Sequence, residues 1–313
     1  MNTLIIRPGA LGDTLMALPA LCEMEARTDV TFVGRNPGIR YIGHAVKHIM
    51  DMEAAGWHRL FLEKPDPLGL PVSWAEHVVA FFKDEDGRLS TNLKAYFPGT
   101  SLHLFPTHPT PGEPVHTAYY FAACLERAGL PVDPARAMAL AREGRLGFSR
   151  GEPAPRNSLV FHPGSGDPGK NYAPAFWIRL LEMLRANKGL DALPKVWLLG
   201  PAEAGLVNII EKNKGVADVG VISCPDKAQL LHLLAGALCL IGHDSGISHL
   251  AAMLGTPAIA LFRKSDPVQW HPLGPRVQVM TGETSESDLI EGIKRALLNF
   301  MAAMQESRVR RRD

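Results

Sequence analysis

The sequence predicts a two-domain α/β protein in which each domain is built around a doubly wound, Rossmann-like parallel sheet. Short apolar runs typical of buried strands alternate with segments of helical periodicity, and this alternation occurs twice along the 313 residues. The chain is too long for one ordinary core, and its 46% hydrophobic and 21% charged residues are typical of a globular protein. Such sheets bind ligands at the carboxyl ends of their strands, so we expect the two domains to face each other across a cleft there.

The first domain is expected to span residues 1–150. A helix should follow the first strand, because Leu15, Leu18 and Leu21 recur at helical spacing. A further helix over 117–128 should end at Gly129. From there to about residue 156 the sequence is irregular and rich in proline and arginine, which indicates a linker. Strands are expected at 4–6, 30–33, 48–50, 77–82 and 101–105.

The second domain is expected to span residues 151–313 and to repeat the alternation of strand and helix. The final helix has one apolar side, and its packing back onto the first domain stays open; the basic tail that follows it should be solvated. Strands are expected at 158–162, 195–199, 238–241 and 257–262, and helices at 176–187, 203–213, 227–235, 247–254 and 287–305.

Bulk properties exclude several classes of protein. The formal net charge of +1 gives no reason to expect nucleic acid as a partner. The four cysteines are far apart and form no C-x-x-C pair, which favours reduced thiols in a cytoplasmic protein. The N-terminus lacks the features of a signal peptide, and no apolar run reaches about 18 residues. We therefore expect a soluble protein.

The segment 238–252 is the most informative in the chain. An apolar strand over 238–241 meets Asp244-Ser245-Gly246, and a helix follows. Free backbone N–H groups and the positive end of a helix dipole attract phosphate at such a corner. Asp244 could accept hydrogen bonds from hydroxyls, and His249 could donate one to an anionic oxygen. A capped helix with a surface histidine explains the same residues equally well.

A second glycine-rich turn lies at 164–170 and fits part of an ATPase phosphate loop, G-x-x-x-x-G-K. The fit then fails, because Asn171 stands where the magnesium-binding Ser or Thr should be and Pro174 delays the helix. We interpret the turn as a phosphate-contacting loop of another design, in which Lys170 supplies a cation for a diphosphate. A plain surface turn is the alternative.

Asp13 stands at the top of the first strand and the start of a helix. It could be a helix N-cap, or a general base that faces the cleft. Asp84-Glu85-Asp86 follows an apolar run and could hold a divalent cation, but its neighbours favour a polar turn. The histidines and cysteines show no zinc-binding spacing, and neither Ser165 nor Ser245 lies in a G-x-S-x-G motif. Zinc enzymes and serine hydrolases therefore have little support.

Three motifs in order along the chain resemble those of the heptosyltransferase family, the ADP-heptose:lipopolysaccharide glycosyltransferases of glycosyltransferase family 9. The resemblance spans nearly the whole chain, and the stretch 262–274 is similar to the segment that follows the nucleotide site in this family. The motifs are Arg7–Leu15 with Leu18–Leu21, His162–Lys170, and Asp244–Gly246 with His249 and Gly255–Pro257.

The resemblance implies a GT-B type transferase that is inverting, needs neither metal nor cofactor, and uses an ADP-sugar as substrate. The second domain would hold most of the donor, and the first would bind a lipid-linked, lipid A–core acceptor. Work on such an acceptor implies a cytoplasmic enzyme, with peripheral contact to the inner membrane left open, as is the oligomeric state.

The resemblance also assigns roles to individual residues. Asp13 would be the base that deprotonates the acceptor hydroxyl, with the glycine-rich loop of Gly9 and Gly12 beside the acceptor. On the donor side, Lys170 and Ser165 would contact the diphosphate, Asp244 the sugar hydroxyls and Glu203 the ribose, while the Ser245 and Gly246 backbone with His249 would stabilise the leaving ADP.

Two departures from the family pattern leave the substrates open. Asn171-Tyr172 stands where the family usually has a basic residue and Trp, and the region 57–100 matches nothing assignable. The same fold with another nucleotide sugar and glycan acceptor is therefore an alternative. A nucleotide-sugar-binding protein without transferase activity is another, although such a protein has no need of Asp13.

Overall fold

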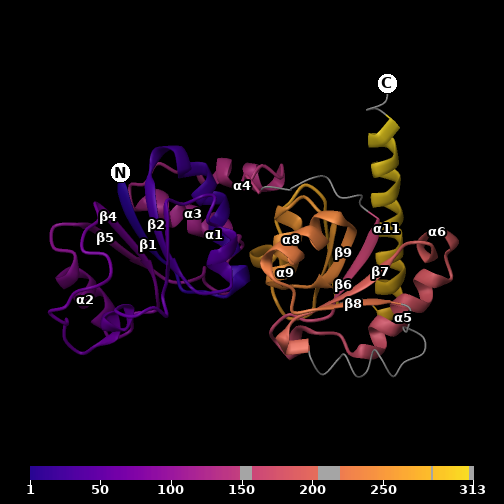
Figure 1. Cartoon of the computed structure of the whole chain (residues 1–313), viewed down its shortest axis with the longest axis horizontal. Coiled ribbons are helices and arrows are strands. Elements are labelled where there is room, and N and C mark those ends of the chain that lie inside the picture. Colours follow the sequence, from indigo (N-terminus) through magenta and orange to yellow (C-terminus); the bar gives the residue numbers. More distant parts are fainter. Residues whose placement is uncertain (149–156, 204–218, 283–284, 310–313) are drawn as a thin grey trace. The chain divides into compact units, whose positions relative to one another are not determined.

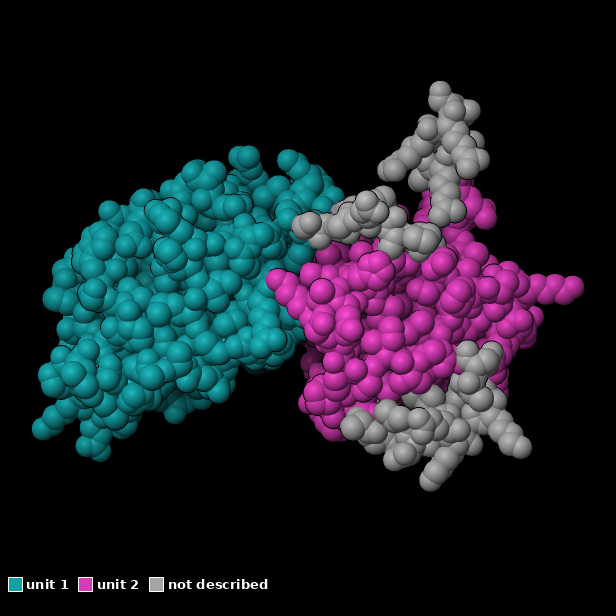
Figure 2. Space-filling view, viewed as in Figure 1, with its two compact units in different colours: residues 1–148 teal, residues 149–313 magenta. Residues whose placement is uncertain are grey.

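The computed structural model describes residues 1–148, 157–203, 219–282 and 285–309. The chain forms two compact units, residues 1–148 and 149–313, each an α/β unit with an all-parallel sheet (Figures 1 and 2). Two parallel-sheet α/β domains are therefore confirmed, while the expected boundary at residue 150 falls outside the described residues. Within the described ranges, no helix combines the length and the apolar character needed to cross a membrane.

The sheet of unit 1 has the strand order β3-β2-β1-β4-β5, and all five expected strands are present. The order reverses beside β1, with β2 paired on one side and β4 on the other. Loops at such a reversal leave a crevice at the carboxyl ends of the strands, where ligands bind. The strands are β1 (Asn2–Ile6), β2 (Asp29–Gly34), β3 (His48–Asp51), β4 (His77–Phe81) and β5 (Ser101–Phe105).

Helices cover both faces of this sheet because alternate strand residues point to opposite sides. Leu4, Ile6 and Val78 pack with Trp57 and Leu93 in one buried cluster, whereas Phe81 stacks on Phe121 from another helix. Helices α1 (Leu11–Met24), α3 (Thr117–Arg127) and α4 (Pro134–Arg142) pack against one another, and α2 (Arg88–Tyr96) packs against the 3-10 helix η3 (Trp57–Phe61). Two more 3-10 turns are η1 (Glu25–Arg27) and η2 (Gly38–Tyr41).

The predicted linker over 129–156 is wrong where α4 lies. Asp133 accepts hydrogen bonds from the backbone N–H groups of Ala135 and Arg136, and Pro134 occupies the first turn. Asp is a common N-cap residue, and Pro is common in the first turn of a helix. Pro134, one of the prolines that suggested a linker, therefore marks the start of a helix. Residues 149–156 of that linker lie outside the described part.

The sheet of unit 2 has the order β11-β10-β9-β6-β7-β8, with every pair parallel. Its reversal lies between β6 and β9, so the loops that follow these two strands are neighbours. The strands are β6 (Ser158–His162), β7 (Lys195–Leu199), β8 (Gly220–Ser223), β9 (Ala237–His243), β10 (Ala258–Phe262) and β11 (Val277–Thr281). Edge strands β8 and β11 were not expected, because both are half-exposed and lack a continuous apolar run.

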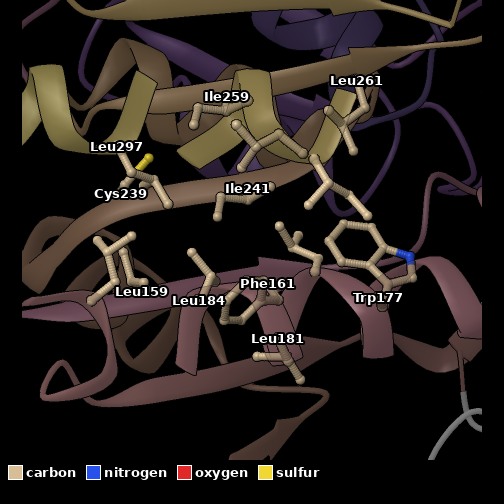
Figure 3. Packing of buried hydrophobic residues seen from close by; sticks show 14 of the residues in the cluster. Leu159, Phe161, Trp177, Leu181, Leu184, Cys239, Ile241, Ile259, Leu261 and Leu297 are labelled. Atoms are coloured by element: carbon tan, nitrogen blue, oxygen red, sulfur yellow. The ribbon is translucent and has the colours of Figure 1, made fainter. Parts of the chain in front are cut away.

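Two groups of helices enclose this sheet, with α8 (Lys227–Gly236) and α9 (Gly246–Met253) on one side (Figure 1). On the other side, α5 (Pro174–Arg185), α6 (Lys188–Asp191) and α11 (Glu286–Val309) bury a core in which Phe161 meets Trp177 (Figure 3). Helix α11 packs against α5 and β9. The predicted helix over 203–213 lies outside the described residues except for Glu203. Shorter elements are η4 (Pro168–Lys170), η5 (Pro201–Glu203) and α10 (Pro267–Trp270).

Candidate active-site residues in the two units

In unit 1, Asp13 stands at the third position of α1, directly after the loop that leaves β1. Its Oδ2 accepts a hydrogen bond of 3.0 Å from the backbone N–H of Ala10, which is the N-cap residue. The alternative that Asp13 is itself the N-cap is therefore wrong: its carboxylate reaches back to the N-cap, as in a capping box. Gly9 allows this close packing, because a Cβ at that position would lie 2.5 Å from the Cβ of Asp13.

The sequence did not reveal the partner of Asp13. His108 follows β5, and its Nε2 lies 2.8 Å from Oδ1 of Asp13. Arg7 ties their two loops together: Nη1 donates to the Thr107 carbonyl at 2.6 Å, and Nε donates to the Asp13 carbonyl at 3.3 Å. The Arg7 side chain is buried, with its guanidinium against the rings of Phe81 and Phe121. The one feature of the sequence that could have pointed to His108 as a site residue is its position just after the strand predicted over 101–105.

This environment keeps Asp13 ionised. Burial raises the pKa of the Asp13 carboxyl, but the hydrogen bond from His108, the Arg7 charge and the Ala10 N–H lower it by more, so the pKa lies below its ordinary value of 3.8. The side chain remains 24% exposed. Asp13 is thus a carboxylate at neutral pH, held in one orientation and accessible from solvent, as a general base requires.

A cavity of ≈ 280 Å³ lies at the same edge of the unit 1 sheet, after β4 and β5. Asp84 lines it, but its carboxylate accepts hydrogen bonds from the backbone N–H groups of Leu89 and Ser90 and so caps α2. That use supports the polar-turn interpretation of this segment. No group of three or more His, Cys, Asp or Glu side chains that could hold a metal is found among the described residues. The lining residues are Phe82, Lys83, Asp84, Glu85, Leu104, Phe105 and Pro106.

In unit 2, Asp244 lies at the centre of a polar cluster just after β9. Its Oδ2 accepts from Lys170 Nζ at 2.7 Å and from Ser265 Oγ at 2.5 Å, and its Oδ1 lies 3.5 Å from His249 Nε2. Burial raises the pKa of Asp244, but His249, Lys170 and Ser265 together lower it well below the usual range. The structure thus brings together three of the expected donor-site residues and adds Ser265.

His249 and Ser245 are buried, and His249 Nε2 and Ser245 Oγ have partners within the protein. The His249 side chain is 2% exposed and faces Asp244, where an anionic ligand oxygen had been expected. Ser245 is the N-cap of α9, and its Oγ accepts from the Ser248 N–H. The first intrahelical bond runs from His249 N–H to the Ser245 carbonyl, so the N–H groups of Gly246 and Ile247 precede it. The helix terminus therefore keeps its ability to bind an anion.

The loop after β6 holds the remaining expected donor residues. Ser165 Oγ lies 2.6 Å from Asn171 Oδ1 and 2.8 Å from the Asp167 carbonyl, which folds the loop back on itself. Glu203 is buried and accepts from the Gly200 N–H at 2.8 Å. A side chain on Gly164 would overlap the Glu203 carboxylate, so Glu203 lies directly against the loop.

The end of this loop is anchored to the sheet. The Tyr172 N–H donates to His243 Nε2 at 2.8 Å. Burial lowers the pKa of His243 to about 3, with a smaller contribution from the nearby His162. The imidazole therefore stays neutral and can accept this hydrogen bond. Arg263, in the segment after β10, donates to the Asn171 carbonyl and stacks on the Tyr172 ring. The sequence did not single out Arg263 or Ser265.

The model of glycosyltransferase family 9 (heptosyltransferase) matches residues 89–293, about two thirds of the chain. The chain belongs to glycosyltransferase family 9. The family resemblance seen in the motifs is thereby confirmed, and the protein is a glycosyltransferase. The matched range contains Lys170, Asp244 and His249, while Asp13 precedes it.

Solved structures agree with this family assignment at the level of the fold. The chain is similar to E. coli heptosyltransferase WaaC with ADP (16% identity, TM-score 0.67, covering 95% of this chain and 100% of that one). It is also similar to a family 9 glycosyl transferase from Veillonella parvula DSM 2008, with 17% identity and a TM-score of 0.66 over 95% of this chain and 98% of that one. For E. coli ADP-heptose lps heptosyltransferase II the identity is 16% and the TM-score 0.62, over 96% of this chain and 99% of that one. No curated protein sequence matches. These likenesses confirm the GT-B type fold of this family 9 enzyme.

Proposed function

We propose that this family 9 enzyme transfers a heptose, or a similar sugar, from an ADP-sugar to a lipopolysaccharide-core-type acceptor, with inversion at the anomeric carbon and without a metal. The observation that carries the proposal is the convergence of Lys170, Asp244 and the N-terminus of α9 at the sheet reversal of unit 2. Two of the similar solved structures are described as WaaC with ADP and with ADP-2-deoxy-2-fluoro heptose, which supports this donor class.

Unit 2 has the chemistry that a departing nucleoside diphosphate requires. Negative charge develops on the diphosphate as the bond to the sugar breaks, and fixed cations and N–H groups stabilise it. In the proposed site these are the Gly246 and Ile247 N–H groups and Lys170. Lys170 pairs with Asp244, so it would be shared with the diphosphate, leaving Asp244 Oδ2 able to accept a sugar hydroxyl.

The remaining donor contacts follow from the loop after β6. Ser165 would bind the diphosphate, for which its hydroxyl must turn away from Asn171. Glu203 would accept from the ribose hydroxyls with the carboxylate oxygen that does not bind Gly200. His249 would act mainly through Asp244, because its ring faces that carboxylate.

Unit 1 supplies the base in this proposal. In an inverting transfer, the acceptor oxygen attacks the anomeric carbon while the bond from that carbon to the phosphate oxygen breaks and its electron pair leaves with ADP. The acceptor hydroxyl must lose a proton as it attacks, and Asp13 is ionised and accessible to receive it. No cofactor enters the scheme. A lipid-linked acceptor would place this enzyme in the cytoplasm, in peripheral contact with the inner membrane.

The direct test is product formation. The purified chain is incubated in EDTA with a lipid A–core acceptor and each of a panel of ADP-, UDP- and GDP-sugars, ADP-heptose included. Mass spectrometry of the acceptor detects transfer, and NMR gives the anomeric configuration. We expect transfer from ADP-heptose with inversion. Transfer only from another nucleotide sugar would establish the alternative substrate, and a requirement for magnesium or manganese would contradict the metal-free mechanism.

A further inference from the structure

Three consecutive residues after β10 each contact the proposed donor site. Arg263 donates to the Asn171 carbonyl and lies 4.8 Å from the centre of the Tyr172 ring. Lys264 places its Nζ so close to Gly169 that any side chain at that position would overlap it. Ser265 donates to Asp244. The segment 263–265 is therefore a third wall of this site, beside the loops after β6 and β9.

The charges of this site are unequally compensated. The Lys170 ammonium is paired with Asp244, and His249 faces the same carboxylate. The Arg263 guanidinium is engaged by a carbonyl and an aromatic face. Lys264 is exposed, and within the described ranges it has no hydrogen bond or ion pair. Among the described cations of the site, its ammonium is thus one that an incoming anion meets without first breaking an ion pair or a hydrogen bond.

The position of Lys264 also suits this role. Gly169 belongs to the short helical turn η4 in the loop proposed to contact the diphosphate, next to Lys170. The absence of a side chain at Gly169 leaves room for the Lys264 ammonium against the loop backbone. A mobile surface lysine would normally extend into water, whereas this one lies against the loop that the proposed function assigns to the diphosphate.

We propose that Lys264 is a donor-binding residue that contacts the diphosphate of the nucleotide sugar, with Arg263 holding Asn171 and Tyr172 in place beside it. The proposal rests on the proposed function only for the ligand class, a nucleoside diphosphate sugar. Lys264 joins Lys170 as a second ammonium for the leaving diphosphate, which supplies charge that a divalent metal would otherwise provide.

The test is calorimetric binding of ADP, AMP and adenosine to the full chain in EDTA. We compare the wild type with Lys264→Ala and with Lys188→Ala, a control that removes an exposed lysine of the same unit at the start of α6. Lys264→Ala should weaken ADP binding about tenfold, the weak end of charge-assisted hydrogen bonds, and leave adenosine binding unchanged. The affinity for AMP should fall less than the affinity for ADP. High salt should reduce the difference in ADP affinity between Lys264→Ala and the wild type. Lys188→Ala should bind all three ligands as the wild type does.

Two further variants separate charge from shape. Lys264→Arg keeps the cation and should retain most of the ADP affinity, whereas Gly169→Ala should displace the ammonium and weaken ADP binding while all charges remain. Unchanged ADP affinity of Lys264→Ala, or an equal loss for ADP and adenosine, would overturn the role of Lys264 and leave the proposed function standing. Failure of the wild type to bind ADP would overturn both.

Discussion

Replacing Asp13 by Asn separates its possible roles in structure and catalysis. The carboxylate binds the Ala10 N–H with one oxygen and His108 Nε2 with the other. Asn can keep its oxygen towards Ala10 and turn its amide NH₂ towards His108, whose neutral ring accepts a hydrogen bond in one tautomer. The substitution therefore preserves the local geometry and removes the negative charge.

The stability cost of this substitution should be small. Loss of a negative charge in the first turn of a helix costs about 0.3–1 kcal/mol. For a unit of this size, that corresponds to a fall in melting temperature of about 1–4 °C. Asp133→Asn is a matched control, because Asp133 also binds backbone N–H groups at a helix start but belongs to no proposed site. Both variants should fold and bind ADP as the wild type does.

Catalysis should respond very differently. General base catalysis contributes about 10²–10⁴-fold, so Asp13→Asn should reduce sugar transfer by at least about a hundredfold, whereas Asp133→Asn should transfer sugar normally. Because the pKa of Asp13 is lowered, wild-type kcat/KM should stay level from neutral pH towards pH 5 and fall only below the ordinary carboxylate value of 3.8. Normal transfer by Asp13→Asn would show that Asp13 only stabilises the helix start, and the proposed mechanism would be wrong.

Three more predictions concern Lys170, His108 and the metal requirement of ADP binding. Lys170→Ala should weaken ADP binding by about 1.5–3 kcal/mol in calorimetry. It should also lower the melting temperature at pH 7, because it removes a partner of the Asp244 carboxylate. The lowered pKa of Asp244 keeps this carboxylate ionised in the folded protein, so the loss should be as large at pH 5 as at pH 7 and should fade only as the pH falls well below 3.8; a loss that disappears between pH 7 and pH 5 would contradict this. His108→Ala should raise the pKa of Asp13 and move the acid limb of kcat/KM to higher pH, while His108→Gln, which can still donate to Asp13, should restore most of the wild-type profile; identical profiles for all three proteins would exclude a positioning role. Finally, ADP should raise the melting temperature as much in EDTA as in magnesium, and stabilisation seen only with a divalent metal would refute metal-independent donor binding.

The fold could be predicted wherever burial leaves a periodic pattern. The strand over 237–243 is buried along its whole length, and its apolar run predicted it directly. The edge strands β8 and β11 were not predicted. Each pairs with only one neighbouring strand, and many of its side chains are exposed, so its sequence shows no continuous apolar run. Helix α4 was not predicted for another reason. Pro134 taken alone indicates the end of regular structure, and only together with Asp133 before it does it indicate the start of a helix.

The site could be predicted only where its chemistry is carried by a local motif. Asp13, Lys170 and Asp244 each lie in or next to a glycine-containing segment that follows a strand, and such segments are recognisable in the sequence. His108 is 95 positions from Asp13, and the two meet because their loops follow β1 and β5 at the same edge of one sheet. No spacing rule connects them, so the pairing depends on strand order, which a single sequence leaves undetermined.

The strand order of unit 2 also explains why residues far apart in the sequence meet at its proposed donor site. The loops after β6, β9 and β10 are neighbours because these strands are adjacent in a parallel sheet, and they contribute Lys170, Asp244 and the segment 263–265 in turn. In sequence, Arg263-Lys264-Ser265 is indistinguishable from a solvated turn. Its position in the sheet brings a guanidinium and an ammonium against the loop after β6 and a hydroxyl against Asp244 in the loop after β9. The proposed metal-free departure of a diphosphate needs such a concentration of hydrogen-bond donors, and parallel topology assembles it from segments that are far apart in the chain.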